Sequence, residues 1–284
     1  MRVTFLGTGT SHGIPVIGCS CPVCTSPNPK NRRNRIGVWL HDGPAHLGRD
    51  LSDRVRGTAP EAGASRPPEI PRGLSAVIDV SSEFRTASLA NGLKHLDFVL
   101  LTHSHSDHAS GLDDLRIFSQ ASGKAMPIYA DKRTLDEIRQ RFSYAFDERK
   151  AYGGGVPQYE LRPAAQPFRE GNWTVTPLPV MHGPDPILGF RVGNFAFITD
   201  VTVIPEATLD LLQGLDVLAL DCLRPRPHTT HLSFDQAVAY ARRIGARRTF
   251  MIHMTHDFEH DELEQMLPAG MRAAYDGLTV EIAD

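Results

Sequence analysis

The chain has 284 residues, of which 41% are hydrophobic and 22% charged, and its formal net charge at pH 7 is −3. The near balance of charge gives no global electrostatic footprint for nucleic acid or an anionic membrane. No apolar run approaches the roughly 18 residues that span a bilayer, and the N-terminus lacks the apolar region of a secretory signal. We therefore expect a cytoplasmic protein with a small-molecule partner, not nucleic acid or a membrane; the oligomeric state is open, with a homodimer as one option.

A strand is predicted over residues 3–6, and a cysteine motif follows soon after it. In Cys19-Ser20-Cys21-Pro22-Val23-Cys24 three thiols lie within six positions. Three thiolates this close suit three corners of a tetrahedral zinc site, whose fourth ligand must come from elsewhere in the chain. Buried free cysteines are the alternative. The basic run over residues 28–35 is either a solvated face or a contact for an anionic substrate.

The next two predicted strands, residues 36–40 and 75–80, are separated by a long irregular stretch. Residues 41–74 are rich in Gly, Pro, Ala, Ser and Arg and show no periodicity, which predicts a loop insertion. Because the second strand resumes the same sheet pattern, we expect one domain over residues 1–284. Asp79, near the end of that strand, is either a turn residue or a support for a metal site.

A strand-like run over residues 96–102 delivers several metal-ligating side chains to the point where the strand should end. They are His103, His105, Asp107 and His108. Because residues two apart in an extended segment point the same way, His103 and His105 can bind one cation while Asp107 and His108 turn toward a second. The loop therefore predicts a metal site with room for two metals, and a solvated polar turn is the weaker alternative.

The rest of the chain predicts helices and strands in alternation. Helices are expected over residues 109–121, 132–146, 205–213 and 234–244, and strands over residues 127–130, 173–178, 187–192, 195–199, 217–220, 249–252 and 278–282. Strands gather in meanders in each half, with helices between them. The predicted fold class is therefore α/β, an αββα sandwich of two mixed sheets flanked by helices, which fits better than a doubly wound parallel sheet.

Single potential ligands follow three of the predicted strands. His182, Asp200 and His253 each come directly after an apolar run, and function gathers at such strand ends and their loops. Any one of them alone is more typical of a polar turn. Together with the loop at residues 103–108 they become candidate metal ligands.

These motifs resemble the metallo-β-lactamase superfamily. Its H-x-H-x-D-H loop matches residues 103–108, and its remaining motif positions match, in order, Asp79, His182, Asp200 and His253. Residues 7–15, the cysteine motif, residues 252–256 and residues 275–277 look like the PhnP branch. Members of that branch are phosphodiesterases of carbon–phosphorus lyase pathways that open cyclic ribosyl phosphates.

The resemblance implies a dinuclear site and a separate structural zinc. One active-site metal would be bound by His103, His105 and His182, the other by Asp107, His108 and His253, with Asp200 bridging. A His/Asp site of this kind accepts Zn²⁺, Mn²⁺ or Fe²⁺. The structural Zn²⁺ would be bound by Cys19, Cys21, Cys24 and His256, with Cys222 as the competing fourth ligand.

The function implied is that of a metal-dependent phosphodiesterase, which hydrolyses small phosphodiesters or cyclic ribosyl phosphates with a hydroxide activated by two metals. The expected catalytic residues are Asp107 and His231, the latter as the acid that protonates the leaving alkoxide, with His228 as runner-up. Alternatives are another hydrolase of the superfamily (a tRNA 3′-processing endonuclease, a lactonase or a thioesterase) and a non-catalytic zinc-binding module.

Overall fold

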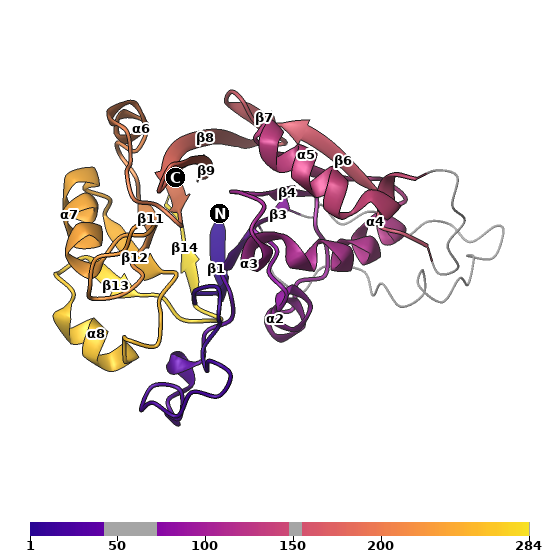
Figure 1. Ribbon diagram of the computed structural model, residues 1–284. Helices are drawn as coiled ribbons and strands as arrows, with labels where there is room; N and C mark the ends of the chain where they lie inside the picture. The colour runs from indigo at the N-terminus through magenta and orange to yellow at the C-terminus, as the bar shows by residue number, and fades with distance from the viewer. Residues whose placement is uncertain (43–72, 148–154, 284) are drawn as a thin grey trace.

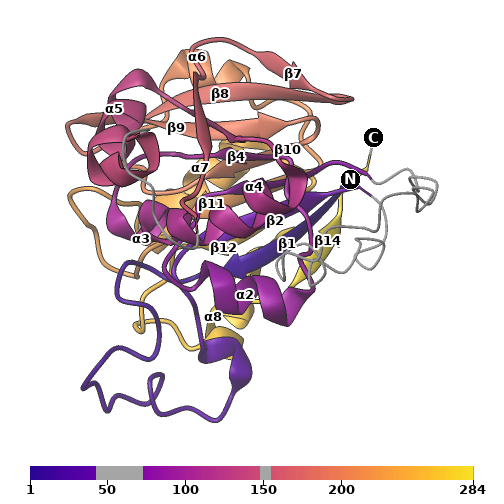
Figure 2. The same cartoon turned by 90° about the vertical axis from the view of Figure 1, so that its right-hand side faces the viewer.

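The computed structural model describes residues 1–42, 73–147 and 155–283, so that the loop insertion predicted over residues 41–74 lies almost entirely outside the described residues. Two seven-stranded sheets pack face to face, and helices cover the outer side of each (Figures 1 and 2). The predicted αββα sandwich is confirmed. Among the described residues, no helix combines the length and apolar character that crossing a bilayer requires.

The first sheet comes from the N-terminal half of the chain and is completed by the last strand. Its strands, in spatial order, are β14 (Thr279–Glu281), β1 (Arg2–Gly7), β2 (Gly37–His41), β3 (Ser75–Ile78), β4 (Phe98–Leu100), β5 (Met126–Ala130) and β6 (Tyr159–Pro163). The first four are antiparallel neighbours, whereas β3 to β6 run parallel. In Figure 1 the yellow β14 lies beside the indigo β1, which joins the two ends of the chain.

The second sheet comes from the C-terminal half. Its strands, in spatial order, are β13 (Met271–Ala273), β12 (Arg248–Ile252), β11 (Val217–Asp221), β10 (Phe195–Ile198), β9 (Asp185–Val192), β8 (Trp173–His182) and β7 (Phe168–Glu170). The strands β10 to β13 run parallel, and β7 to β10 are antiparallel neighbours. Both sheets are therefore mixed, and each contains a run of parallel strands whose carboxyl ends share one edge.

Three apolar layers hold these elements together. Between the sheets lies the largest core, in which Phe5, Phe98, Phe190 and Phe197 are fully buried. A second layer joins the first sheet to its helices, and a third joins the second sheet to its own. The α-helices are α2 (Phe84–Asn91), α3 (Ser106–Ala109), α4 (Arg116–Ser122), α5 (Lys132–Arg141), α6 (Glu206–Asp210), α7 (Phe234–Ile244) and α8 (His260–Met266).

The helix α7 shows why some boundaries are readable from sequence. Ser233 and Gln236 form a reciprocal capping box at its start, and Gly245 ends it with a left-handed φ of 69°. Buried residues recur on one face at Ala237, Ala241 and Ile244. The predicted and observed bounds of this helix are the same.

Other predictions of secondary structure need correction. The helix expected over residues 109–121 is divided into α3, a 3₁₀ segment (Ser110–Leu115) and α4, because Gly111 donates to the Val80 carbonyl, which ties the chain to the end of β3. The helix expected over residues 132–146 ends at Arg141, and a 3₁₀ turn (Ser143–Phe146) follows. The elements α2, α8, β6, β7 and β13 were not predicted, and all are short.

Candidate metal centre

Potential metal ligands meet where strand ends of the two sheets come together. The first sheet contributes Asp79 after β3 and the loop at residues 103–108 after β4. The second contributes His182 at the end of β8, Asp200 after β10 and His253 after β12. The ligand-type residues from His103 to His253, up to 150 positions apart in the sequence, thus gather at one place.

The backbone at this edge is conformationally unusual. Among the described residues, the non-glycine positions with positive φ are Asp79, Asp200 and His253, at 62°, 54° and 60°. Such left-handed conformations are uncommon for residues with a Cβ and persist where the surroundings hold them, often at functional sites. All three belong to this cluster, which indicates that side-chain placement here is maintained at a cost in backbone strain.

Asp200 presents one carboxylate oxygen to each of two groups of histidines. Its Oδ2 lies 4.0 Å from Nε2 of His103 and 3.9 Å from Nε2 of His182. Its Oδ1 lies 3.4 Å from Nε2 of His108 and 3.3 Å from Nε2 of His253. Two ligand atoms bound to the same ion, each about 2 Å from it, lie about 3 to 4 Å apart. The spacing suits two ions with Asp200 between them.

The ligand-type atoms form three overlapping groups that share Asp200, and the atoms of each group lie within 4.8 Å of one another. The first group is His103, His105, His182 and Asp200; the second is Asp107, His108, Asp200 and His253. These two are the sets that the resemblance implied; the third is Asp200, Asp221, His231 and His253. In the first two groups every member is buried except His105, so the first group is the one that reaches the protein surface.

Hydrogen bonds on the far side of three imidazoles fix which nitrogen faces the cluster. Nδ1 of His108 lies 2.8 Å from Oδ2 of Asp79, and Nδ1 of His182 lies 2.8 Å from the Thr230 carbonyl. Nδ1 of His103 contacts the Thr102 hydroxyl, which is itself bound to Asp79. Because these acceptors draw the ring proton to Nδ1, the Nε2 lone pairs point into the cluster, as metal ligation requires. Asp79 therefore has the supporting geometry that was one of its two predicted alternatives.

The buried polar atoms fit divalent cations. Nε2 of His103, His108 and His253 is buried and, within the described residues, has no hydrogen-bond partner. Burial raises the pKa of Asp200, but His253 and His108 outweigh it and hold that pKa well below its usual value. Burial lowers the pKa of His253, yet Asp200 and Asp107 raise it to about 10. The buried carboxylates of Asp107 and Asp200 are therefore stable only beside positive charge, which either protonated imidazoles or two cations can supply.

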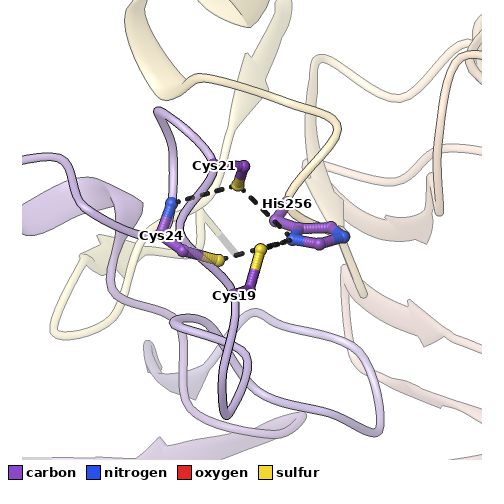
Figure 3. A group of neighbouring side chains, drawn as sticks. All are labelled: Cys19, Cys21, Cys24 and His256. Atoms are coloured by element: carbon purple, nitrogen blue, oxygen red, sulfur yellow. Dashed lines mark hydrogen bonds between the residues drawn. The ribbon is translucent and has the colours of Figure 1, made fainter.

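The cysteine motif and His256 form a separate cluster (Figure 3). Nδ1 of His256 lies 3.3, 3.5 and 3.4 Å from the sulfurs of Cys19, Cys21 and Cys24. A sulfur and a nitrogen on one tetrahedral zinc lie about 3.5 Å apart, so these four side chains fit such an ion. Cys222, the competing fourth ligand, is fully buried in the apolar layer beneath α7 instead.

Comparisons with known proteins agree with this geometry. Residues 75–254 match the family described as "Beta-lactamase superfamily domain". The chain is also 34% identical to a diphosphatase from the PhnP family known from its crystal structure, with a TM-score of 0.82, over 99% of this chain and 97% of that one. The chain belongs to the beta-lactamase superfamily, and within it to the PhnP family.

Two curated relatives extend the comparison. An octanoyltransferase of Porphyromonas gingivalis is 35% identical over 283 residues, which are 98% of this chain but only 51% of that protein. The chain thus spans about half the length of this relative. A ribonuclease Z of Mycobacterium bovis is 28% identical over 201 residues, 60% of this chain and 71% of the relative. The cysteine cluster lies outside the residues that the superfamily match covers.

A buried carboxylate at the PhnP-family site was missed by the sequence analysis. Asp221 ends β11 and is fully buried, and its Oδ1 lies 3.4 Å from Nδ1 of His253 and 3.5 Å from Nδ1 of His231. Its other oxygen accepts the Leu232 backbone N–H at 2.8 Å. The available signal was an acidic residue directly after an apolar strand, the same pattern that identified Asp200.

The two histidines proposed for acid catalysis occupy different positions. Nε2 of His231 lies 3.9 Å from Oδ2 of Asp200, at the edge of the metal cluster. The ring of His228 lies further along the same loop, 5.1 Å from the ring of His231, and its Nδ1 accepts the Thr230 backbone N–H at 3.3 Å. His231 is therefore the one that reaches the site.

Proposed function

We propose that the chain is a metal-dependent phosphodiesterase that hydrolyses small phosphodiesters or cyclic phosphates. The observation that carries the proposal is the carboxylate of Asp200, which offers one oxygen to each histidine group while His231 lies 3.9 Å away. A paired site suits phosphoryl transfer, in which negative charge builds on several oxygens at once.

The residues that would bind the metals are those of the two groups. His103, His105 and His182 would hold one ion, Asp107, His108 and His253 the other, and Asp200 both. When bound, two divalent cations supply an activated water nucleophile and neutralise phosphoryl oxygens. The role of Asp107 in this proposal is that of a ligand: its carboxylate lies 3.4 Å from Nε2 of His108 and 3.7 Å from Nε2 of His253.

His231 would donate the proton that the leaving alkoxide needs. Its Nδ1 faces the buried Asp221 carboxylate at 3.5 Å, which holds the ring with Nε2 toward the site. A positioned acid of this kind contributes about 10²- to 10⁴-fold to the rate when the leaving group is poor. Asp221 is the positioning residue for this step and contacts His253 as well.

A second candidate is cleavage of a phosphoanhydride, favoured by the 34% identical relative that is called a diphosphatase. The two activities share the metal site but differ in the leaving group. An alkoxide needs a proton, whereas a phosphate leaves readily without one. Dependence on His231 therefore separates them: hydrolysis of an alkyl diester requires it, and hydrolysis of a diphosphate does not.

The test is a substrate panel on the metal-loaded enzyme, with bis-p-nitrophenyl phosphate, p-nitrophenyl phosphate, cyclic ribosyl phosphates, a nucleoside diphosphate, a tRNA precursor, a lactone and a thioester. We expect the diesters and cyclic phosphates to turn over much faster than the monoester. Faster turnover of the diphosphate would favour the second candidate. Full metal loading with no diester or cyclic phosphate turnover would sink the phosphodiesterase proposal, and turnover of the tRNA, lactone or thioester would identify the alternative.

A further inference from the structure

One short segment of the chain contributes a ligand to each of the two kinds of metal cluster. His253 belongs to the Asp107–His108–Asp200 group, and His256, three residues later, completes the cysteine cluster. Only Met254 and Thr255 separate them. A displacement of His256 can therefore be transmitted to His253 over a very short length of backbone.

The Met254 backbone is bound on both sides to the glycine-rich loop after β1. Its N–H donates to the Thr8 carbonyl at 3.0 Å, and its carbonyl accepts the Thr10 N–H at 3.2 Å. Gly9, between Thr8 and Thr10, has no space for a side chain, because a Cβ there would lie 2.9 Å from both the Cβ and the carbonyl oxygen of Arg33. The loop is thus packed tightly between Met254 and the segment that follows the cysteine motif.

Arg33 donates hydrogen bonds to backbone carbonyls on both sides of His256. Its guanidinium donates from Nη1 to the Thr255 carbonyl at 2.9 Å and from Nη2 to the Phe258 carbonyl at 2.8 Å. The side chain is only 1% exposed, which contradicts a solvated basic face at this position of the run 28–35. A buried guanidinium bound to carbonyls of a neighbouring segment is a structural brace.

We propose that the cysteine cluster is a positioning device for His253, so that a metal bound by Cys19, Cys21, Cys24 and His256 strengthens metal binding at the Asp107–His108–His253 position. His253 has a φ of 60°, and a left-handed histidine persists only while its surroundings hold it. The brace through Arg33 and the loop at residues 8–10 holds the segment from one side, and a metal at His256 holds it from the other. The inference concerns metal binding and does not depend on which ester is hydrolysed.

The prediction is a selective loss of metal affinity in Cys19→Ala. Cys19 is half-exposed, and its sulfur contacts His256. Co²⁺ titration separates the sites, because thiolate ligation gives charge-transfer absorption that a His/Asp site lacks. A His253→Ala reference, which keeps the His103–His105–His182 position intact, identifies the signal of that position. At the His103–His105–His182 position, we expect Cys19→Ala to bind Co²⁺ as tightly as the wild type does. At the position of His253, we expect it to bind Co²⁺ at least about tenfold more weakly, which is the size of effect that a ligand's supporting contacts have.

Three variants separate positioning from general damage. His256→Cys retains four ligands and should keep the wild-type affinity at the position of His253, whereas Cys222→Ala removes a thiol outside both clusters and should leave every site unchanged. Gly9→Ala keeps all ligands but forces the loop away from Arg33; it should keep the thiolate absorption and weaken the position of His253. Wild-type affinity at both active-site positions in Cys19→Ala, or equal weakening at both, would overturn the proposal. If Cys19→Ala fails to fold, the wild type with its cysteine cluster filled is compared with the wild type whose cysteine cluster is empty, by the same two outcomes.

Discussion

The two kinds of metal cluster in this molecule are built in opposite ways. The cysteine cluster takes three of its four ligands from six consecutive residues, and two of its cysteines are half-exposed. The active-site cluster takes its ligands from strand ends distributed between residues 103 and 253, and nearly all are buried. The first depends on local sequence, and the second depends on the correct packing of two sheets.

This difference predicts different behaviour. Four ligands that close a tetrahedron leave no position for substrate and typify a structural site. In the active-site cluster two groups share Asp200, and His105 is exposed, so ions there remain accessible to solvent and to a chelator. We therefore expect the active-site ions to exchange readily and the cysteine-bound ion to remain.

The largest effect is expected from Asp200→Asn, which removes the shared carboxylate charge. Both active-site positions should lose affinity, and diester hydrolysis should fall at least about 10³-fold, because metal catalysis supplies several kcal/mol of transition-state stabilisation. Metal analysis should still find the cysteine-bound ion. Asp136→Asn, which changes an exposed carboxylate paired with Lys132 on α5, is the matched control and should behave as the wild type. Retention of two active-site ions in Asp200→Asn would contradict the shared-ligand geometry.

His231→Ala should give the next largest effect and leave the metal content unchanged. We expect a loss of about 10²-fold in kcat for an alkyl diester or cyclic phosphate. The loss should be much smaller for bis-p-nitrophenyl phosphate, whose leaving group needs no proton. The matched control is His228→Ala, from the same loop, which should change kcat little. Equal losses on both substrates would remove His231 from its role as acid.

The last predicted effect is on stability, not on rate, and concerns Asp276, which ties the loop between the two clusters to the segment before the last strand. It accepts the Thr8 hydroxyl at 2.8 Å and the Asn34 N–H at 2.6 Å, and burial raises its pKa to about 7. Because the native pKa lies above the unfolded value of about 3.9, this group's contribution to stability is complete below about pH 4. It is lost as the pH rises through about 7.

Asp276→Asn should therefore become more stable relative to the wild type as the pH rises from 5 to 8. Each pKa unit corresponds to about 1.4 kcal/mol, so the difference should not exceed about 4 kcal/mol. Urea unfolding of both proteins at several pH values measures it. If the free energy of unfolding of the wild type instead rose relative to that of the variant with rising pH, Asp276 would be a carboxylate in the folded protein, with Arg33 as its counter-charge.

The sequence identified most of the side chains that gather at the candidate site but few of their surroundings. His103 to His108, His182, Asp200 and His253 could be found because each follows an apolar strand, and strand ends of one edge converge. Asp221 has the same signal but was overlooked, since its role depends on two histidines that only the fold brings to it. Arg33 could not be placed from sequence: its charge favours a surface, and only the carbonyls of Thr255 and Phe258 make its burial tolerable.

The same limit applies to the secondary structure. The helix α7 was predictable because its cap, apolar face and terminal glycine all agree. The strands β7 and β13 have three residues each and lie at the edges of the second sheet, so pairing with a neighbour defines them more than their own composition does. The left-handed φ of Asp79, Asp200 and His253 likewise follows from the packed strand ends, not from residue type.

The most direct test is a count of metals per chain before and after brief dialysis against a chelator, with diester hydrolysis measured on the same samples. The geometry predicts about three metals per chain at first and one afterwards, with activity lost and then regained when two equivalents of Zn²⁺ or Mn²⁺ are returned. The remaining ion should show thiolate ligation. A chain that holds a single metal when fully active, or whose activity survives the loss of both exchangeable ions, would contradict a reactive dinuclear centre beside a structural site.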